Sequence, residues 1–184
     1  MDFLLLSITS LIALINPIGI IPTYIGLLGD YDPQEHKNIT YRAILCAFIV
    51  LMTFSIMGNL IFNFFGITMD AFRIVGGILF MRIGLDIVES KISRTKSTPK
   101  EQKEAEEKDE IAYSPLGVPL IAGPGAITSV MILSNQVNSI NEKILFTLSI
   151  VICMILTYIA LIMGNTLSKK IGTTGIRIIQ RLMG

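Results

Sequence analysis

Two short strings of polar and helix-breaking residues lie inside long apolar stretches of this chain. They are Asn16-Pro17-Ile18-Gly19 and Ala122-Gly123-Pro124-Gly125. Proline has no amide hydrogen and clashes with the preceding helical turn, while glycine accepts almost any backbone angle. Each string therefore predicts a break in a helix. The first amides after such a break have no partner within the helix and carry the positive end of its dipole, so they suit a carboxylate or another anion.

Side chains near the two breaks add further polar groups to this predicted site. Asn16 offers both a donor and an acceptor, and Thr128 and Ser129 each offer a hydroxyl. A small zwitterionic amino acid would place its carboxylate on the amides and its ammonium group on unwound carbonyls. The alternative is that the prolines and glycines only kink two helices so that they pack closely. The predicted substrate-binding residues are Asn16, Pro17, Gly19, Gly123, Pro124, Gly125, Thr128 and Ser129.

Two residues of opposite charge lie four positions apart in another apolar stretch. Arg82 and Asp86 share one face of a predicted helix, and charges at membrane depth usually pair or line a water path. Asp86 is therefore the candidate for coupling transport to an ion. The alternative is a structural pair, or an arginine whose long side chain reaches the membrane surface. Cys46 and Cys153 fall inside apolar runs and indicate small buried residues, so we expect neither a metal site nor another cofactor.

The composition is that of an integral membrane protein. Hydrophobic residues make up 52% of the 184 residues, charged residues only 16%, and the mean hydropathy is +0.67. Soluble domains carry about 25% charged residues. The formal net charge of +1 is spread without a basic face that would bind nucleic acid. An intramembrane enzyme would need a nucleophile with a base, or two carboxylates, within the bilayer. Asp86 alone supplies neither set, so we expect no enzyme activity.

Apolar stretches long enough to cross a bilayer predict an all-α fold with five visible transmembrane helices. The first and the fourth contain the breaks at Asn16–Gly19 and Ala122–Gly125. A hydrophilic segment at residues 89–113 separates the third span from the fourth, and we interpret it as a charged cytoplasmic linker. The five predicted spans are Phe3–Leu28, Ala43–Phe65, Ala71–Val88, 114–134 and Ile144–Met163.

The two halves of the chain resemble each other at a nearly constant offset. Pro124 follows Pro17 by 107 residues, and Met163-Gly164-Asn165 repeats Met57-Gly58-Asn59 after 106 residues. Because a complete half would have three spans, the second half must be inverted relative to the first, as in many secondary transporters. The predicted division is a first three-helix repeat at 1–88, the linker at 89–113 and a second repeat at 114–184, in which the sixth span is absent beyond its start.

Three strings carry a likeness to a known family. They are Asn16-Pro17-Ile18-Gly19-Ile20-Ile21-Pro22, the stretch Phe72–Leu79, and Pro119-Leu120-Ile121-Ala122-Gly123-Pro124-Gly125-Ala126-Ile127-Thr128. In these strings, and over essentially its whole length, the chain resembles the MarC family of bacterial inner-membrane proteins. The resemblance implies a fold of six spans and a location in the bacterial inner membrane. It also implies transport of small neutral amino acids, the activity to which some members are assigned. The chain departs from the family pattern by ending before the sixth span.

Together these features predict a secondary transporter or exporter of a small polar solute, with neutral amino acids as the leading class. The alternative is a non-transporting membrane subunit, or an assembly or stress-related membrane protein. Twelve lysine and arginine residues fall in the predicted cytoplasmic connections, and two, Arg73 and Lys143, fall in the outer ones. The positive-inside rule therefore places the N-terminus outside. The expected partners are the solute, the lipid bilayer and further copies of the chain, because a missing sixth span leaves one packing face open.

Overall fold

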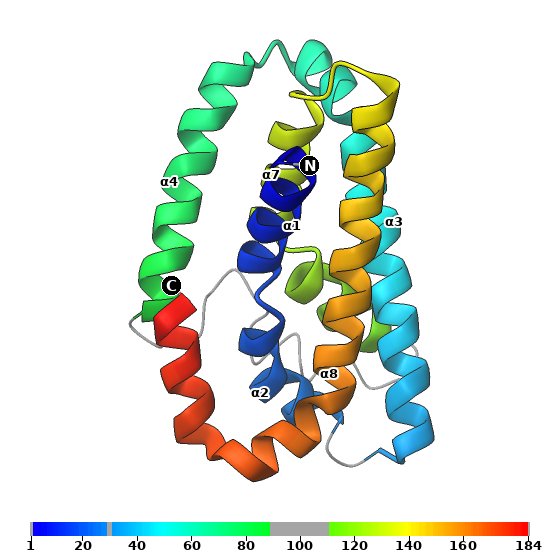
Figure 1. Cartoon of the computed structure of the whole chain (residues 1–184), viewed down its shortest axis with the longest axis vertical. Helices are drawn as coiled ribbons and strands as arrows, with labels where there is room; N and C mark the ends of the chain where they lie inside the picture. The colour runs from blue at the N-terminus through cyan, green and yellow to red at the C-terminus, as the bar shows by residue number, and fades with distance from the viewer. Residues whose placement is uncertain (1, 29–30, 89–110, 184) are drawn as a thin grey trace.

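Helices account for all the regular structure in the described part of the chain. The computed structural model describes residues 2–28, 31–88 and 111–183, and within those ranges it contains helices and no strand. Figure 1 shows these helices packed side by side in one bundle. The predicted all-α fold of an integral membrane protein is confirmed. Most of the predicted linker at 89–113 lies outside the described residues.

The first half of the chain forms four helices, of which the first two make one broken span. They are α1 (Asp2–Ile15), α2 (Pro17–Leu28), α3 (Pro33–Phe65) and α4 (Met69–Val88). The single residue Asn16 separates α1 from α2. α3 ends at Gly66, which has a φ of 64°. This left-handed conformation suits glycine, and it lets the Ile67 amide donate to the Phe62 carbonyl at 2.9 Å.

The second half contains the second broken span and one long helix. Its elements are η1 (Ala112–Ile121), α7 (Pro124–Ser134) and α8 (Ile140–Met183). η1 is wound irregularly because Ser114 and Val118 have extended dihedrals. Each of them precedes a proline, and proline disfavours the helical conformation at the residue before it. η1 and α7 meet at an angle of 59°. Both breaks predicted from the sequence are therefore present in the structure.

Length and apolarity support three or four membrane spans in the described residues. Three helices are long and apolar enough to cross a membrane on their own. The number of candidate spans rises to four if the bent pair of η1 and α7 forms one span. α4 has the length of the predicted third span, but Arg73, Arg82 and Asp86 lie within it and lower its apolarity. The sequence predicts five spans, and α4 is the one that apolarity does not support. The three helical stretches that are long and apolar enough on their own are Phe3–Leu28, Pro33–Gly58 and Ile140–Gly164.

The two broken spans run in opposite directions through the middle of the bundle. In Figure 1 the chain descends through α1 and α2, whereas it climbs through η1 and α7. α1 contacts α7 and α2 contacts η1, so the part of each span before its break lies beside the part of the other span after its break. α3 climbs and α4 descends, while α8 descends and then turns back upward beside α4. This is the arrangement that an inverted repeat of three segments generates.

Matching capping interactions begin α3 and α8. The Glu35 carboxylate accepts a hydrogen bond from the Asp32 amide at 3.4 Å. At the start of α8, the Glu142 carboxylate accepts from the Ser139 amide and the Ser139 hydroxyl accepts from the Glu142 amide, both at 3.2 Å. These caps start α3 well before the span predicted at Ala43. Ser139 follows Asp32 by 107 residues, the offset that also relates the two prolines of the breaks.

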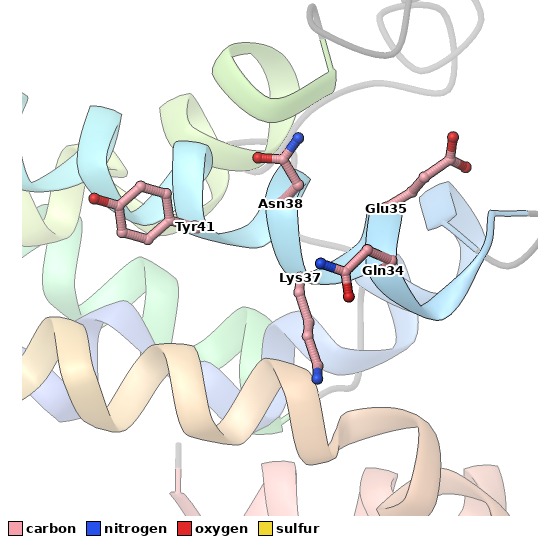
Figure 2. Close-up of a pocket in the computed structure, with 5 residues that line it drawn as sticks. All are labelled: Gln34, Glu35, Lys37, Asn38 and Tyr41. Atoms are coloured by element: carbon pink, nitrogen blue, oxygen red, sulfur yellow. The ribbon is translucent and has the colours of Figure 1, made fainter.

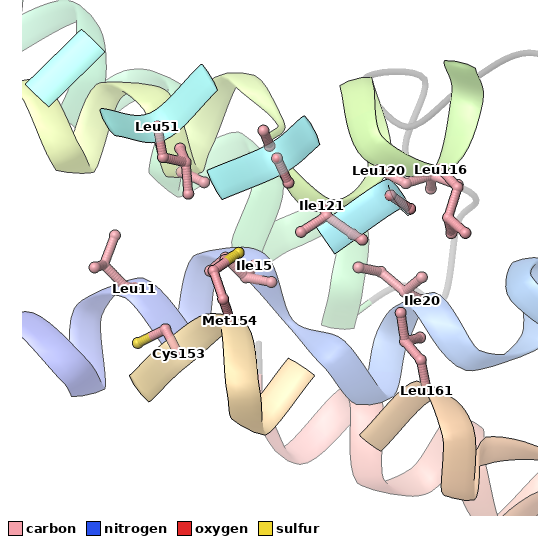
Figure 3. Packing of buried hydrophobic residues seen from close by; sticks show 14 of the residues in the cluster. Leu11, Ile15, Ile20, Leu51, Leu116, Leu120, Ile121, Cys153, Met154 and Leu161 are labelled. Atoms are coloured by element: carbon pink, nitrogen blue, oxygen red, sulfur yellow. The ribbon is translucent and has the colours of Figure 1, made fainter. Parts of the chain in front are cut away.

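Apolar side chains divide between a buried core and an outward-facing surface. Figure 3 shows Ile15 and Ile20, which flank the first break, in the same cluster as Ile121, which precedes the second. Other large apolar side chains point away from the bundle, and Ile56 and Phe64 are 74% and 80% exposed. A surface of this kind suits lipid as its surrounding solvent, because hydrocarbon chains solvate apolar side chains well.

Candidate functional site

Asn16 ends one helix and begins the next. Its φ of 49° lies in the left-handed region, which asparagine tolerates better than most residues. Its amide donates to the Ile12 carbonyl at 2.9 Å, which closes α1. Its carbonyl accepts from the Ile20 amide at 3.2 Å, and its side-chain Oδ1 accepts from the Gly19 amide at 3.0 Å. Asn16 therefore supplies an N-terminal cap for α2 from its own side chain.

Pro17 and Gly19 complete this cap. Pro17 is the first residue of α2, where its fixed φ fits a helix and its missing amide costs nothing. A Cβ atom on Gly19 would lie 2.5 Å from Nδ2 of Asn16, so only glycine leaves room for the capping side chain. The order asparagine, proline, any residue, glycine thus encodes a self-capped break. Within it, the Gly19 amide is bonded to Asn16, although the sequence analysis assigned the amides of this turn to the solute.

The second break lacks such a cap. Gly123 is extended, with φ −77° and ψ 169°, and has no side chain to fold over the first turn of α7. Its carbonyl accepts from the Ile127 amide at 3.0 Å, which starts the helix as at the first break. Pro124 again occupies the first helical position. The next two residues, Gly125 and Ala126, are buried, and their amides donate no hydrogen bond to any described residue.

Two buried hydroxyls on α7 also have no partner in the described part of the chain. Thr128 is 7% exposed and Ser129 is 4% exposed, and neither hydroxyl forms a hydrogen bond within the described ranges. The four other serines and threonines that are buried in the described ranges each donate to a carbonyl three or four residues earlier on their own helix, at 2.6 to 2.8 Å. Those four are Ser7, Thr40, Ser149 and Thr157.

The unpartnered groups of α7 gather at its first turn. Gly125, Thr128 and Ser129 are spaced by three and four residues, so they share one face of the helix. Helical side chains tilt toward the N-terminus, which carries both hydroxyls toward the free amides. The methyl group of Thr128 packs against α4, because its Cγ2 lies 2.7 Å from the position that a Cβ on Gly76 would take. Two amides and two hydroxyls thus lie together at this buried turn.

The first break contributes one further free donor. Asn16 is 2% exposed, and its Nδ2 donates no hydrogen bond in the part of the chain that the structure describes. The residues that border the two breaks belong to one buried cluster. Across the described ranges, no hydrogen bond joins Asn16 to residues 122–129. Of the predicted site residues, Asn16, Pro17, Gly125, Thr128 and Ser129 are buried, Gly19 and Gly123 are half-buried, and Pro124 is exposed. The donors without a partner among the described residues are concentrated at α7.

The structure describes only one of the two side chains of the predicted charged pair, Arg82 and Asp86. Arg82 is exposed, which agrees with a side chain that reaches out of the bundle. The side chain of Asp86 lies outside those described, so its role in ion coupling stays a prediction. Among the described residues, no group of three histidine, cysteine, aspartate or glutamate side chains is placed to hold a metal ion.

A surface depression lies away from both breaks. It has a volume of about 360 Å³ and opens widely at the beginning of α3, as Figure 2 shows. Its lining contains none of the predicted site residues, and charged and amide side chains extend from it in different directions. We therefore place the candidate site at the breaks. The depression is lined by Gln34, Glu35, Lys37, Asn38 and Tyr41.

Sequence reasoning did not identify one feature of the site, the contact between α4 and α7. The contact of Gly76 with Thr128 depends on tertiary packing. Its only sequence signal is that small residues on a membrane helix permit close approach of a neighbour.

Comparison with known proteins gives consistent matches over the whole chain. The family model described as "MarC family integral membrane protein" matches residues 1–184. The UPF0056 membrane protein MJ0972 of Methanocaldococcus jannaschii is 40% identical over 184 residues, which cover all of this chain and 81% of that protein. The UPF0056 membrane protein YvbG of Bacillus subtilis is 36% identical over 184 residues, covering all of this chain and 87% of that protein. No solved structure matches.

Proposed function

This chain belongs to the MarC family of integral membrane proteins, and we propose from that premise that it is a secondary transporter of a small polar solute. Neutral amino acids are the class that the site suits best. The names of the relatives describe membrane proteins and specify no solute. The proposal therefore rests on the chemistry of the two breaks.

One observation carries the proposal: buried polar groups that have no partner among the described residues lie at a helix break inside an apolar bundle. A buried polar group that forms no hydrogen bond costs about 1–3 kcal/mol. The amides of Gly125 and Ala126 and the hydroxyls of Thr128 and Ser129 are four such groups at one turn. Interrupted backbone at membrane depth is tolerated where it is buried in protein or lines a polar cavity. A bound polar solute would supply the missing partners and offset this cost.

The antiparallel arrangement of the broken spans supports a transport cycle. Secondary transporters commonly place their solute at the midplane, between two discontinuous helices related by an inverted repeat. Here α1–α2 and η1–α7 run in opposite directions with their breaks in one buried cluster. We interpret the low exposure of Asn16, Thr128 and Ser129 as that of a conformation in which these polar groups are shielded from solvent. Rocking of one half against the other would open the site to each side in turn.

We place the protein in the plasma membrane with its N-terminus outside. The support is the distribution of lysine and arginine over the connections. In Figure 1, α3 begins at the lower end of the bundle, and Lys37 and Arg42 lie near its beginning. Arg73 at the start of α4 and Lys143 at the start of α8 fall at the opposite end.

Exchange of labelled amino acids in proteoliposomes tests the proposed function. Vesicles containing the purified protein and unlabelled alanine, glycine or serine should accumulate the same labelled amino acid from outside. Ser129→Ala should reduce this exchange, because it removes one of the site's donors. Ser149→Ala removes a buried hydroxyl that is bonded within α8 and should leave exchange unchanged. If the folded protein exchanges none of the three amino acids, this class of solute is excluded and a non-transporting membrane subunit becomes the better interpretation.

A further inference from the structure

The two breaks differ in what they offer to a ligand. On the basis of the proposed function, we infer that the solute binds with a carboxylate at the first turn of α7, and that the first turn of α2 does not serve as a second carboxylate site. The solute class is then a small molecule with one carboxylate and a positive group of its own. Three features of the described residues carry this inference.

The first feature is the difference in capping. The Gly19 amide in the first turn of α2 is bonded to Oδ1 of Asn16 at 3.0 Å. The corresponding turn of α7 follows Gly123, which has no side chain and forms no such cap. A carboxylate at α2 would have to displace the protein's own cap. At α7 it would meet amides that donate to no described residue and that carry the positive end of the helix dipole.

The second feature is that packing prevents α7 from acquiring a cap. A Cβ atom at position 123 would lie 2.8 Å from the carbonyl oxygen of Pro119 in η1. This neighbour is backbone, so it cannot move aside as the end of a flexible side chain would. Serine, threonine, aspartate and asparagine, which cap helices best, are all too large here. The approach of η1 to the break thus keeps the first turn of α7 free of a side-chain cap.

The third feature is the pair of hydroxyls beside these amides. Thr128 and Ser129 are both more than nine-tenths buried, share the face of Gly125 and tilt toward the first turn. In a helix, such hydroxyls usually bond to a carbonyl of the preceding turn, and the four other buried hydroxyl side chains do so. Thr128 and Ser129 do not, which leaves them available to a carboxylate held by the amides.

The charge of the core limits which anion can bind. None of the buried polar side chains in the described ranges is charged. The helix dipole supplies only about half an elementary charge at its N-terminus. A dianion such as phosphate would therefore remain largely uncompensated, whereas a zwitterion supplies its own counter-charge. The buried polar side chains are Ser7, Asn16, Thr40, Thr128, Ser129, Ser149 and Thr157.

A matched pair of ligands tests the inference. Alanine and alaninamide have the same shape and the same ammonium group and differ in the carboxylate. Purified protein in detergent is heated with each ligand, and unfolding is followed with a thiol-reactive fluorescent dye, because Cys153 is fully buried. Alanine should raise the unfolding temperature, and alaninamide at the same concentration should not. Glycine and serine serve as additional carboxylate-bearing probes.

Site variants then locate the carboxylate. Thr128→Val and Ser129→Ala should each raise the half-saturating concentration of alanine about tenfold, the loss typical of one hydrogen bond to a charged group. Ser149→Ala should leave it unchanged.

Three results would each overturn the inference. The first is equal protection by alaninamide, and the second is unchanged affinity for alanine in both site variants. The third is that none of the three amino acids protects a protein that still unfolds cooperatively. Because exchange is measured separately, the outcomes stay distinct. Binding with this pattern but without exchange refutes only transport, and exchange with unchanged affinity in the variants refutes only the carboxylate site.

Discussion

Removing a buried hydroxyl should have opposite effects on stability at two positions of this bundle. Thr157→Val deletes a fully buried hydroxyl that donates to the Cys153 carbonyl at 2.7 Å. Thr128→Val deletes a hydroxyl that is nearly as buried but bonds to no described residue. Valine has nearly the shape of threonine, so both changes leave packing almost intact. The comparison therefore isolates the hydrogen bond.

The expected difference follows from the two environments. Loss of the Thr157 bond should destabilise the protein by about 0.5–1.5 kcal/mol. Loss of the Thr128 hydroxyl should stabilise the ligand-free protein by up to about 1–3 kcal/mol, since an unsatisfied buried polar group is removed. The two free energies of unfolding should therefore differ by at least about 1 kcal/mol, which corresponds to a separation of a few degrees in the midpoint temperature.

Thermal unfolding of both variants in detergent, without added amino acid, measures this difference. Ser129→Ala and Ser149→Ala form a second pair with the same logic, because the Ser149 hydroxyl donates to the Phe146 carbonyl at 2.6 Å. If Thr128→Val loses as much stability as Thr157→Val, then the Thr128 hydroxyl is satisfied in the folded protein. The four donors of α7 would then not form an open site, and the reasoning behind the proposed function would fail.

Three further predictions follow from the helix packing and from the charge distribution. Gly19→Ala should displace the Asn16 side chain that caps α2, since the new Cβ would lie 2.5 Å from it. The free energy of unfolding should fall by about 1 kcal/mol. Gly26→Ala is the control and should not destabilise the protein, because nothing lies within 4 Å of the new Cβ. Gly76→Ala should push α4 against the methyl group that it contacts on α7 and weaken amino acid binding at least severalfold, whereas Gly77→Ala, which faces open space on the same helix, should bind normally. A cysteine replacing Lys143 in protein without other cysteines should react with a membrane-impermeant maleimide added to intact cells; protection until the cells are opened would contradict the proposed orientation.

The breaks could be predicted from the sequence because they depend on local backbone chemistry. Pro17 and Pro124 each occupy the first position of a helix, as their missing amide and fixed φ require. Hydropathy likewise indicates helical spans, because a long apolar segment in lipid must satisfy its own backbone hydrogen bonds, as a helix does. The start of α3 was placed too late because its first turns are polar. The capping pair of Asp32 and Glu35 extends the helix beyond the apolar segment.

The asymmetry between the breaks could not be predicted from the sequence. The motifs look equivalent, and both suggest free amides after a proline. Asn16 caps its own helix because its left-handed backbone directs the side chain over the next turn. Gly123 is excluded from this role by the Pro119 carbonyl of a neighbouring segment. The same limit applies to Thr128 and Ser129, whose position near a break was evident, whereas the absence of their usual bonds depends on how each side chain is turned in the core.

The junction at Asn16 also has a mechanical consequence. One residue holds three hydrogen bonds, through its amide, its carbonyl and its side chain, to the helices on either side. A change in the angle between α1 and α2 would strain or break several of them together, at a cost of about 0.5–1.5 kcal/mol for each bond. The first broken span is therefore stiff at its bend, and α1 and α2 should move as one lever. The second span bends at Ala122 and Gly123 without a side-chain bond across the joint, so the compliance of the bundle is concentrated at the bend beside the free donors of α7.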